Sequence, residues 1–356
     1  MMTLLKRAAI TLSLGAFATA TLAQADVKLQ GAGATFPNPL YQRWIAEYTK
    51  AHPSVKIDYQ SIGSGGGIKG ITEKTVDFAG SDAPLNKKEL AELEKSSKVV
   101  QIPTCAGSVV PAYNIPGVTG EIKFSGDVLA DIYLGTITKW NDARLTALNP
   151  DAKLPDLAIT PAWRTDGSGT TFVWTNYLCT QSDKFKETIG PGKQVSFKAG
   201  QGGKGNEGVA AVVQQTKGAI GYVELNYADA NKIPFGSVKN KDGKFVKASP
   251  ATVSAAGKAA KFEGTVLHAD VWNQPGAEAY PVSSFTYIIL YKELKTRSGT
   301  THEQAEALVD FLTWAVTDGQ KVAGSMSYAP LADSVQKSVK EAIDQITFDG
   351  KPVLKK

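Results

Sequence analysis

Short runs rich in β-branched and aromatic residues alternate with helical patterns along most of the chain. The β-rich run at 55–62 is followed by a helical pattern at 68–74, and the run at 76–79 is followed by one at 87–95. A later β-rich run is at 219–223. Such alternation predicts an α/β fold. The segment "SSFTYIILY", residues 283–291, predicts a strand. The helical pattern after it has one apolar face, which we assign to the core: Leu308, Phe311, Leu312, Ala315 and Val316. Because no long linker interrupts the pattern, we expect two lobes joined by several chain crossings.

The N-terminal residues have the pattern of a secretory signal peptide. Lys6 and Arg7 precede an uncharged stretch at 8–20, and small residues follow up to Ala25. The uncharged stretch is far shorter than the roughly 20 residues that cross a bilayer. We therefore expect cleavage near Ala25 and an exported product that starts at Asp26, with a short buried N-terminal helix as the alternative. The remaining 356 − 25 = 331 residues are enough for two lobes.

Charge and composition argue against several kinds of site. The formal net charge is +5, or +5 − 2 = +3 without the two basic residues of the signal segment, and the basic residues are dispersed. No nucleic-acid surface is expected. Cys105 and Cys179 can form one disulfide or remain two thiols, and the sequence leaves both alternatives open. His52, His268 and His302 lie far apart without metal-binding spacing, so we expect neither a metal nor a cofactor.

Three turns rich in glycine and hydroxyl residues each run directly into a helical pattern. The turns are Thr35-Phe36 in "GAGATFPNPLYQRWIAEY", Ser64 with Gly65–Gly67 in "SIGSGGGIKG", and Ser168, Gly169 and Thr170 in "RTDGSGTTFVWTNYL". Such turns present free N–H groups and a hydroxyl at the positive end of a helix dipole, which favours an anion. For any one turn, helix capping is the simpler interpretation. Three such turns, one of them flanked by Arg164 and Asp166, favour a shared anion.

The second turn also resembles a dinucleotide fingerprint. Gly65, Gly67 and Gly70 have the GxGxxG spacing, and Asp82 lies 82 − 65 = 17 residues after the first glycine. However, an exported chain is not normally supplied with nicotinamide cofactors, and Ser64 has no role in that fingerprint. We interpret the match as a coincidence.

The alternative function from another class is a secreted phosphatase or esterase. Its nucleophile would be Ser168 in "DGSGTT". Asp166 stands where the GxSxG motif has its first glycine, and no histidine is close in the sequence. The enzyme therefore remains the second interpretation.

Several motifs together are more specific than any single turn: "GAGATFPNPLY", "SIGSGGGIKGI", "VDFAGSDAPL", "DIYLGTITKWND", "RTDGSGTTFVWTNYL", "GGKGNEGVAA" and "GAIGYVE". Over the whole mature chain they resemble the periplasmic phosphate-binding protein of the phosphate-specific ABC importer. The resemblance implies a two-lobed Venus flytrap fold, with residues 26–113 and 286–356 in lobe 1 and residues 114–285 in lobe 2, and hinge crossings near Asn114 and Phe285. It implies a monomeric binding protein and not an enzyme, whose partners are phosphate and the transmembrane permease.

The same resemblance implies a phosphate site made of Thr35, Phe36, Ser64, Asp82, Arg164, Ser168, Gly169 and Thr170. Arg164 would make the charged contact, and Asp166 would hold its guanidinium. Asp82 would accept the proton of the phosphate. Sulfate has no proton at neutral pH, so Asp82 would also select against sulfate. Gly65 departs from the family pattern, in which serine is common at that position.

Overall fold

The computed structural model describes residues 26–354, and the sheet at its centre is shared by two lobes. Its eight strands follow the order β2-β1-β3-β11-β4-β8-β6-β7. In that order their bounds are Val55–Ser61, Val27–Gly33, Phe78–Ser81, Ser283–Tyr291, Val99–Tyr113, Ala219–Glu224, Thr160–Arg164 and Gln201–Gly203. The signal peptide expected at residues 1–25 lies outside the described residues. Within residues 26–354, no helix is long and apolar enough to cross a membrane.

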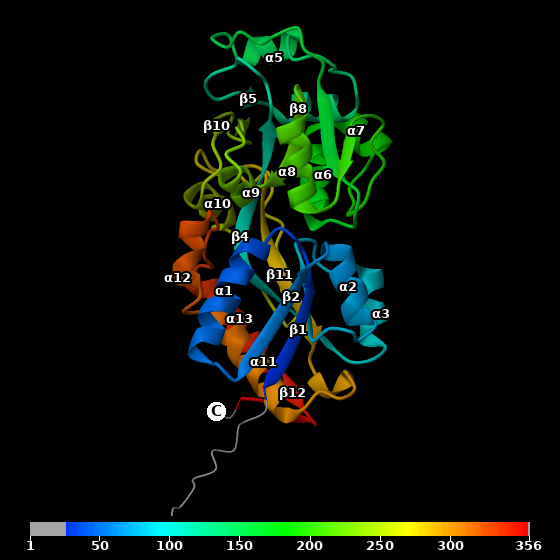
Figure 1. Ribbon diagram of the computed structural model, residues 1–356, viewed down its shortest axis with the longest axis vertical. Helices are drawn as coiled ribbons and strands as arrows, with labels where there is room; N and C mark the ends of the chain where they lie inside the picture. The colour runs from blue at the N-terminus through cyan, green and yellow to red at the C-terminus, as the bar shows by residue number, and fades with distance from the viewer. Residues whose placement is uncertain (1–25, 355–356) are drawn as a thin grey trace, which may run out of the picture.

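The first lobe, at the bottom of Figure 1, is built on three parallel strands, β2, β1 and β3, with β11 antiparallel to β3. Its larger helices are α1 (Asn38–Ala51), α2 (Ser64–Thr72), α3 (Lys87–Glu94), α11 (His302–Ala315) and α13 (Asp333–Ile343). The shorter elements are α12 (Gln320–Ala323), the 3-10 helices Leu294–Thr296 and Gly324–Met326, and the strands β12 (Thr347–Phe348) and β13 (Lys351–Pro352).

The second lobe contains β8, β6 and β7, with β6 parallel to both of its neighbours. Its larger helices are α4 (Gly126–Tyr133), α6 (Gly169–Gln181), α8 (Gly205–Gln215) and α10 (Pro250–Gly257). The shorter elements are α5 (Ala143–Leu148), α7 (Asp183–Thr188), α9 (Leu225–Ala230), β5 (Lys123–Phe124), β9 (Ser237–Lys239) and β10 (Phe245–Val246).

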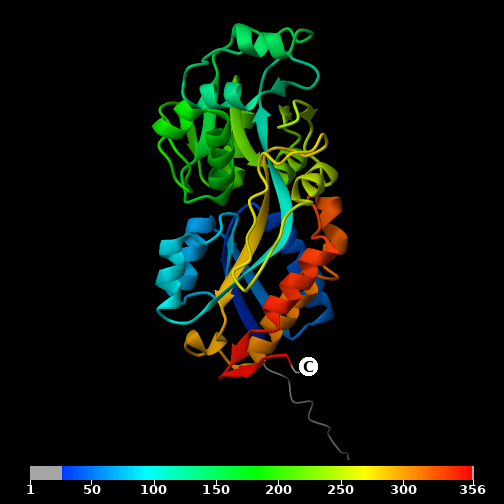
Figure 2. The same cartoon turned by 180° about the vertical axis from the view of Figure 1, so that it is seen from behind.

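The long strand β4 passes from one lobe to the other (Figure 2). Its residues 99–108 pair with β11, whereas residues 109–113 pair with β8. The chain also returns to β4 between α10 and β11, where Leu267 N–H donates to the Gln101 carbonyl at 2.8 Å. The fold is therefore the two-lobed α/β architecture with several crossings that the sequence predicts. The lobe limits at residues 113 and 285 stay a prediction.

Helix α1 illustrates how apolar spacing produces these elements. Leu40, Trp44 and Tyr48 recur every four residues and are buried against the sheet of the first lobe. Such spacing places the three side chains on one helix face. The Trp44 indole nitrogen donates to the Gly319 carbonyl at 2.7 Å, which satisfies its buried polar atom. The predicted apolar face at residues 308–316 is likewise buried.

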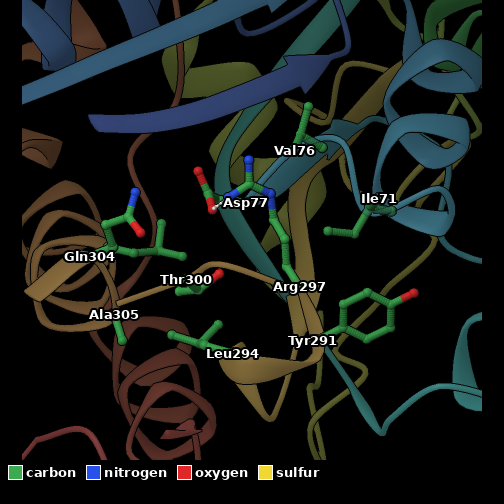
Figure 3. A pocket seen from close by; sticks show the side chains of 10 residues that line it. Ile71, Val76, Asp77, Tyr291, Leu294, Arg297, Thr300, Gln304 and Ala305 are labelled. Carbon is green, nitrogen blue, oxygen red and sulfur yellow. Dashed lines mark hydrogen bonds and ion pairs between the residues drawn. The ribbon is translucent and has the colours of Figure 1, made fainter. Parts of the chain in front are cut away.

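A partly buried ion pair joins the C-terminal part of the chain to the residue that precedes β3. Arg297 Nη1 lies 3.0 Å from Asp77 Oδ1, and Gln30 N–H donates to Asp77 Oδ2 at 2.7 Å. Figure 3 shows the two side chains in a cavity of about 10 Å³ that Ile71 and Val76 also line. Burial raises the pKa of Asp77, against the opposing hydrogen bond from Gln30 and charge of Arg297. We assign this cavity to the packing of the first lobe.

Both cysteines are free thiols. Cys105 is buried on β4, and Cys179 is half-buried on α6. Of the two alternatives that the sequence left open, the structure has the unpaired one.

Candidate functional site

The carboxyl ends of parallel strands from both lobes meet at their junction, and helices begin there. In the first lobe β1 leads to Thr35 and α1, β2 leads to Ser64 and α2, and β3 leads to Asp82. In the second lobe β6 ends at Arg164 before α6, and β7 ends just before α8. Ligands of open α/β sheets bind beyond the carboxyl ends of the strands, and helix N-termini attract anions. Topology alone therefore favours an anion site at this junction.

Thr35 is in contact with the second lobe through its hydroxyl. Thr35 Oγ1 accepts from the Asn206 side-chain nitrogen at 2.7 Å and from the Asn206 N–H at 3.2 Å, and Arg164 Nη1 lies 3.2 Å away. The Thr35 carbonyl accepts from the Tyr227 hydroxyl at 2.6 Å. The turn before it needs glycine, because a Cβ on Gly33, whose φ is +145°, would lie 2.1 Å from the Gly80 carbonyl oxygen. The turn is thus held from both lobes.

Arg164 is a buried cation with a fixed orientation. Only 3% of the residue is exposed. Its Nε and Nη2 donate to the two carboxylate oxygens of Asp166 at 2.8 and 2.5 Å, a bidentate arrangement. Burial alone would raise the pKa of Asp166, but the hydrogen bonds and charge of Arg164 outweigh it and lower that pKa. Asp166 stays ionised, so it aims Nη1 of Arg164 toward Thr35 and Thr170, the latter at 3.4 Å.

Asp82 is a buried carboxyl at the carboxyl end of β3. It is 1% exposed, and its Oδ1 accepts from the Thr286 hydroxyl at 2.7 Å. Burial raises the pKa of Asp82 to about 7, against the opposing hydrogen bond from Thr286 and the charge of Arg164. Near neutral pH this group can therefore either donate or accept one proton.

The N-terminus of α6 approaches the first lobe closely. Gly169 N–H donates to Ser64 Oγ at 3.0 Å, and Asp82 N–H donates to the same oxygen at 3.2 Å. A Cβ on Gly169 would lie 2.5 Å from Asp82 Oδ2, so a larger residue would separate the lobes here. Ser168 caps the helix by accepting from Thr171 N–H at 3.0 Å. Capping and the anion-site pattern thus occur in the same turn.

Several backbone donors at this junction have no protein acceptor in residues 26–354. Among them are the N–H groups of Phe36 and Thr170, and both residues are fully buried. A buried N–H without an acceptor is costly. These donors lie at the same junction as Arg164, the Ser64 and Thr170 hydroxyls and the buried carboxyl of Asp82. The arrangement suits an oxyanion that keeps one proton.

All the residues predicted as a site from the sequence come to this junction, although their roles toward a ligand stay predictions. They are Thr35, Phe36, Ser64, Asp82, Arg164, Ser168, Gly169 and Thr170, with Asp166 beside Arg164.

The sequence reasoning missed two side chains of the junction. Asn206 lies in the first turn of α8 and donates to both Thr35 and Thr170. The glycines of "GGKGNEG" immediately before and within that helix start repeat the design of the other three turns and could have identified it. Thr286 lies within β11, where nothing in the local sequence marks it.

The structure also shows what the residues of the two alternative interpretations, the dinucleotide fingerprint and the Ser168 enzyme, contact. Gly67 of the GxGxxG match packs against β1, where a Cβ would lie 2.7 Å from the Ala32 carbonyl oxygen, so the glycine serves helix packing. The histidines contact other parts of the chain: His52 stacks on Tyr48, and His302 pairs with Glu306. Ser168 is engaged as a helix cap.

Comparison with known proteins places the chain among solute-binding proteins. A family model described as "PBP superfamily domain" matches residues 18–318. The phosphate-binding protein PstS of Pasteurella multocida is 43% identical over 325 residues, covering 91% of this chain and 92% of the relative.

Solved structures share the fold at lower identity. A high-affinity periplasmic phosphate-binding protein, PfluDING, solved with bound phosphate, has a TM-score of 0.71 at 20% identity, covering 88% of this chain and 93% of that one. A phosphate-binding protein from Stenotrophomonas maltophilia has a TM-score of 0.69 at 21% identity, covering 90% of this chain and 94% of that one.

Proposed function

The chain belongs to the PstS family of phosphate-binding proteins, and on that premise we propose that it binds inorganic phosphate between its lobes and delivers it to an ABC importer. The relatives that support this proposal are named as binding proteins and not as enzymes. The protein would act in the periplasm after removal of residues 1–25, as a monomer, and the permease would be its partner. No catalytic step is required of it.

One observation carries the proposal: the buried carboxyl of Asp82 lies at the same junction as the Ser64 and Thr35 hydroxyls and the Arg164 guanidinium, all of which can donate to an anion. A fully deprotonated tetrahedral anion offers only acceptors, so it would meet an ionised Asp82 with repulsion. Phosphate near neutral pH keeps at least one proton, which Asp82 can accept. The proposed ligand is therefore protonated phosphate and not sulfate.

The other predicted residues would share the remaining phosphate oxygens. Arg164 would supply the positive charge through Nη1, while Asp166 holds the Arg164 guanidinium in place through Nε and Nη2. The N–H groups of Phe36 and Thr170 would donate from opposite lobes. Hydroxyls of Thr35 and Ser64 would donate from the first lobe, and those of Ser168 and Thr170 from the second.

Binding would couple to closure of the lobes. Each lobe supplies only part of the proposed donor set, so the full set exists only when both meet the anion. Phosphate would then shift the population from open to closed protein. The permease would recognise the closed form.

The proposal is tested by calorimetric titration of phosphate-stripped protein, residues 26–356, with phosphate and then with sulfate at pH 8. We expect one phosphate per chain and no heat from sulfate. Arg164→Ala should weaken phosphate binding about a hundredfold or more, because a buried bidentate cation is lost. The matched control is Arg43→Ala, which removes an exposed side chain that pairs with Glu47 and should leave phosphate binding normal. Folded wild-type protein that gives no heat with phosphate would refute the proposal.

A further inference from the structure

An ion pair between Lys193 and Glu89 joins the two lobes beside the proposed phosphate site. Lys193 lies in the loop that follows α7 in the second lobe, and its Nζ donates to Glu89 Oε1 on α3 in the first lobe. Only 18% of the Lys193 side chain and 21% of the Glu89 side chain are exposed. By comparison, the Lys98–Glu94 pair beside α3 has a lysine that is 74% exposed. Partial burial makes the interlobe pair less screened by salt than a surface pair.

Glu89 is held in place by its own helix. It is the third residue of α3, where its Oε2 accepts from the Asn86 N–H at 3.1 Å while its own N–H donates to Asn86 Oδ1 at 2.9 Å. This capping box uses one carboxylate oxygen and leaves the other for Lys193. Helix α3 begins at Lys87, five residues after Asp82, so the Glu89 side chain belongs to the part of the first lobe that carries the buried carboxyl.

Lys193 is held equally firmly to the N-terminus of α6. Its carbonyl accepts from Ser168 N–H at 2.8 Å, and the preceding Gly192 N–H donates to Thr175 Oγ1 at 3.0 Å. The loop is therefore tied to both the cap and the second turn of α6. One residue thus fixes the Ser168 turn through its backbone and reaches the opposite lobe through its side chain.

We propose that the Lys193–Glu89 pair is a clasp that sets how long the closed cleft retains phosphate. The inference rests on the proposed function and adds two positioning residues that do not touch the anion. Because the pair exists only when α3 and the α6 turn are together, it stabilises the closed form and not the open one. Loss of such a contact raises the dissociation rate more than it changes the association rate. The clasp should also weaken as ionic strength rises.

The test measures release of labelled phosphate into excess unlabelled phosphate, together with its association rate. The variants are Glu89→Gln, Lys193→Met and the double variant. Glutamine at the third helix position keeps the capping box, so Glu89→Gln removes the charge without removing the cap. Each single variant should release phosphate about three- to tenfold faster, with association within about twofold of wild type. The double variant should match the single ones, because both remove the same contact.

Lys98→Met is the matched control, since it removes a lysine that pairs with a glutamate within the first lobe. Its release rate should equal that of wild type. Raising the salt concentration should accelerate release from wild type more than from Glu89→Gln.

Each outcome has a distinct meaning. Normal wild-type binding with unchanged release in both single variants would overturn the clasp alone, as would additive effects in the double variant. Wild-type protein that retains no phosphate would remove the proposed function and the clasp with it.

Discussion

Asp82 combines two properties that rarely occur together in a buried residue. It is almost fully buried, yet its pKa of about 7 leaves it able to exchange a proton at physiological pH. Thr286 already donates to one of its oxygens, and the other oxygen faces the N-terminus of α6 near Gly169. In the proposed site, this carboxyl would be the group that distinguishes a protonated anion from a fully deprotonated one.

The raised pKa of Asp82 predicts a pH dependence of stability in phosphate-free protein. Folding raises this pKa from 3.8 to about 7, so the folded protein holds the proton more tightly than the unfolded chain does. The contribution to stability is complete below about pH 4 and is lost as pH rises through about 7. Asp82→Asn lacks this titration. As pH rises from about 4 to 7, the calorimetric Tm of Asp82→Asn should therefore increase relative to that of wild type.

Glu224 is a second buried carboxyl whose titration contributes to both Tm values. Burial raises its pKa as well, against the hydrogen bond from Tyr328, but Glu224 is present in both proteins. Most of its effect cancels in the difference between the two Tm values, because the charge of Asp82 is the smallest of the causes that shift the Glu224 pKa. A difference that stays constant across this pH range would contradict the assignment of a titrating proton to Asp82.

Helix α6 has a cap that is also part of the proposed site, and a neighbouring helix provides the comparison. Ser168 caps α6, and Ser182 caps α7 through the same kind of bond, from Phe185 N–H at 3.1 Å. Alanine at either position should lower the free energy of unfolding by about 0.5–2 kcal/mol. Only Ser168→Ala should also weaken phosphate binding, by about tenfold for one lost hydrogen bond.

Denaturant unfolding and phosphate titration of the two serine variants separate the two roles. Equal loss of stability with unequal loss of affinity is the expected pattern. If Ser168→Ala binds phosphate as tightly as Ser182→Ala does, Ser168 acts as a cap alone.

Local patterns predicted the helix starts better than they predicted the full site. Turns of glycine and hydroxyl residues before apolar spacing indicated α1, α2 and α6, because capping and spacing are short-range properties. The start of α8 carries the same glycine pattern, but it was not among the three turns that we identified as a candidate anion site, so Asn206 was missed. Thr286 has no local signal, because its role depends on β11 lying beside β3.

For the molecule as a whole, long-range strand pairing determines which residues meet at the junction of the lobes. Strand β11 lies between β3 and β4, although it follows them by well over a hundred residues, and β4 continues into the second lobe. No local pattern encodes such pairing, so the sequence indicated two lobes without their strand order. The family resemblance implied the two lobes and their hinge crossings but no strand order, which only the structure provides.

The most direct measurement is the ratio of phosphate to sulfate affinity for wild type and Asp82→Asn at pH 8, with Asp58→Asn as an exposed control. An ionised Asp82 should exclude sulfate, whereas an asparagine amide can donate to it. We expect the ratio to fall about ten- to hundredfold in Asp82→Asn and to stay unchanged in Asp58→Asn. An unchanged ratio in Asp82→Asn would contradict the account, because the buried carboxyl would then not select phosphate by accepting its proton in a hydrogen bond.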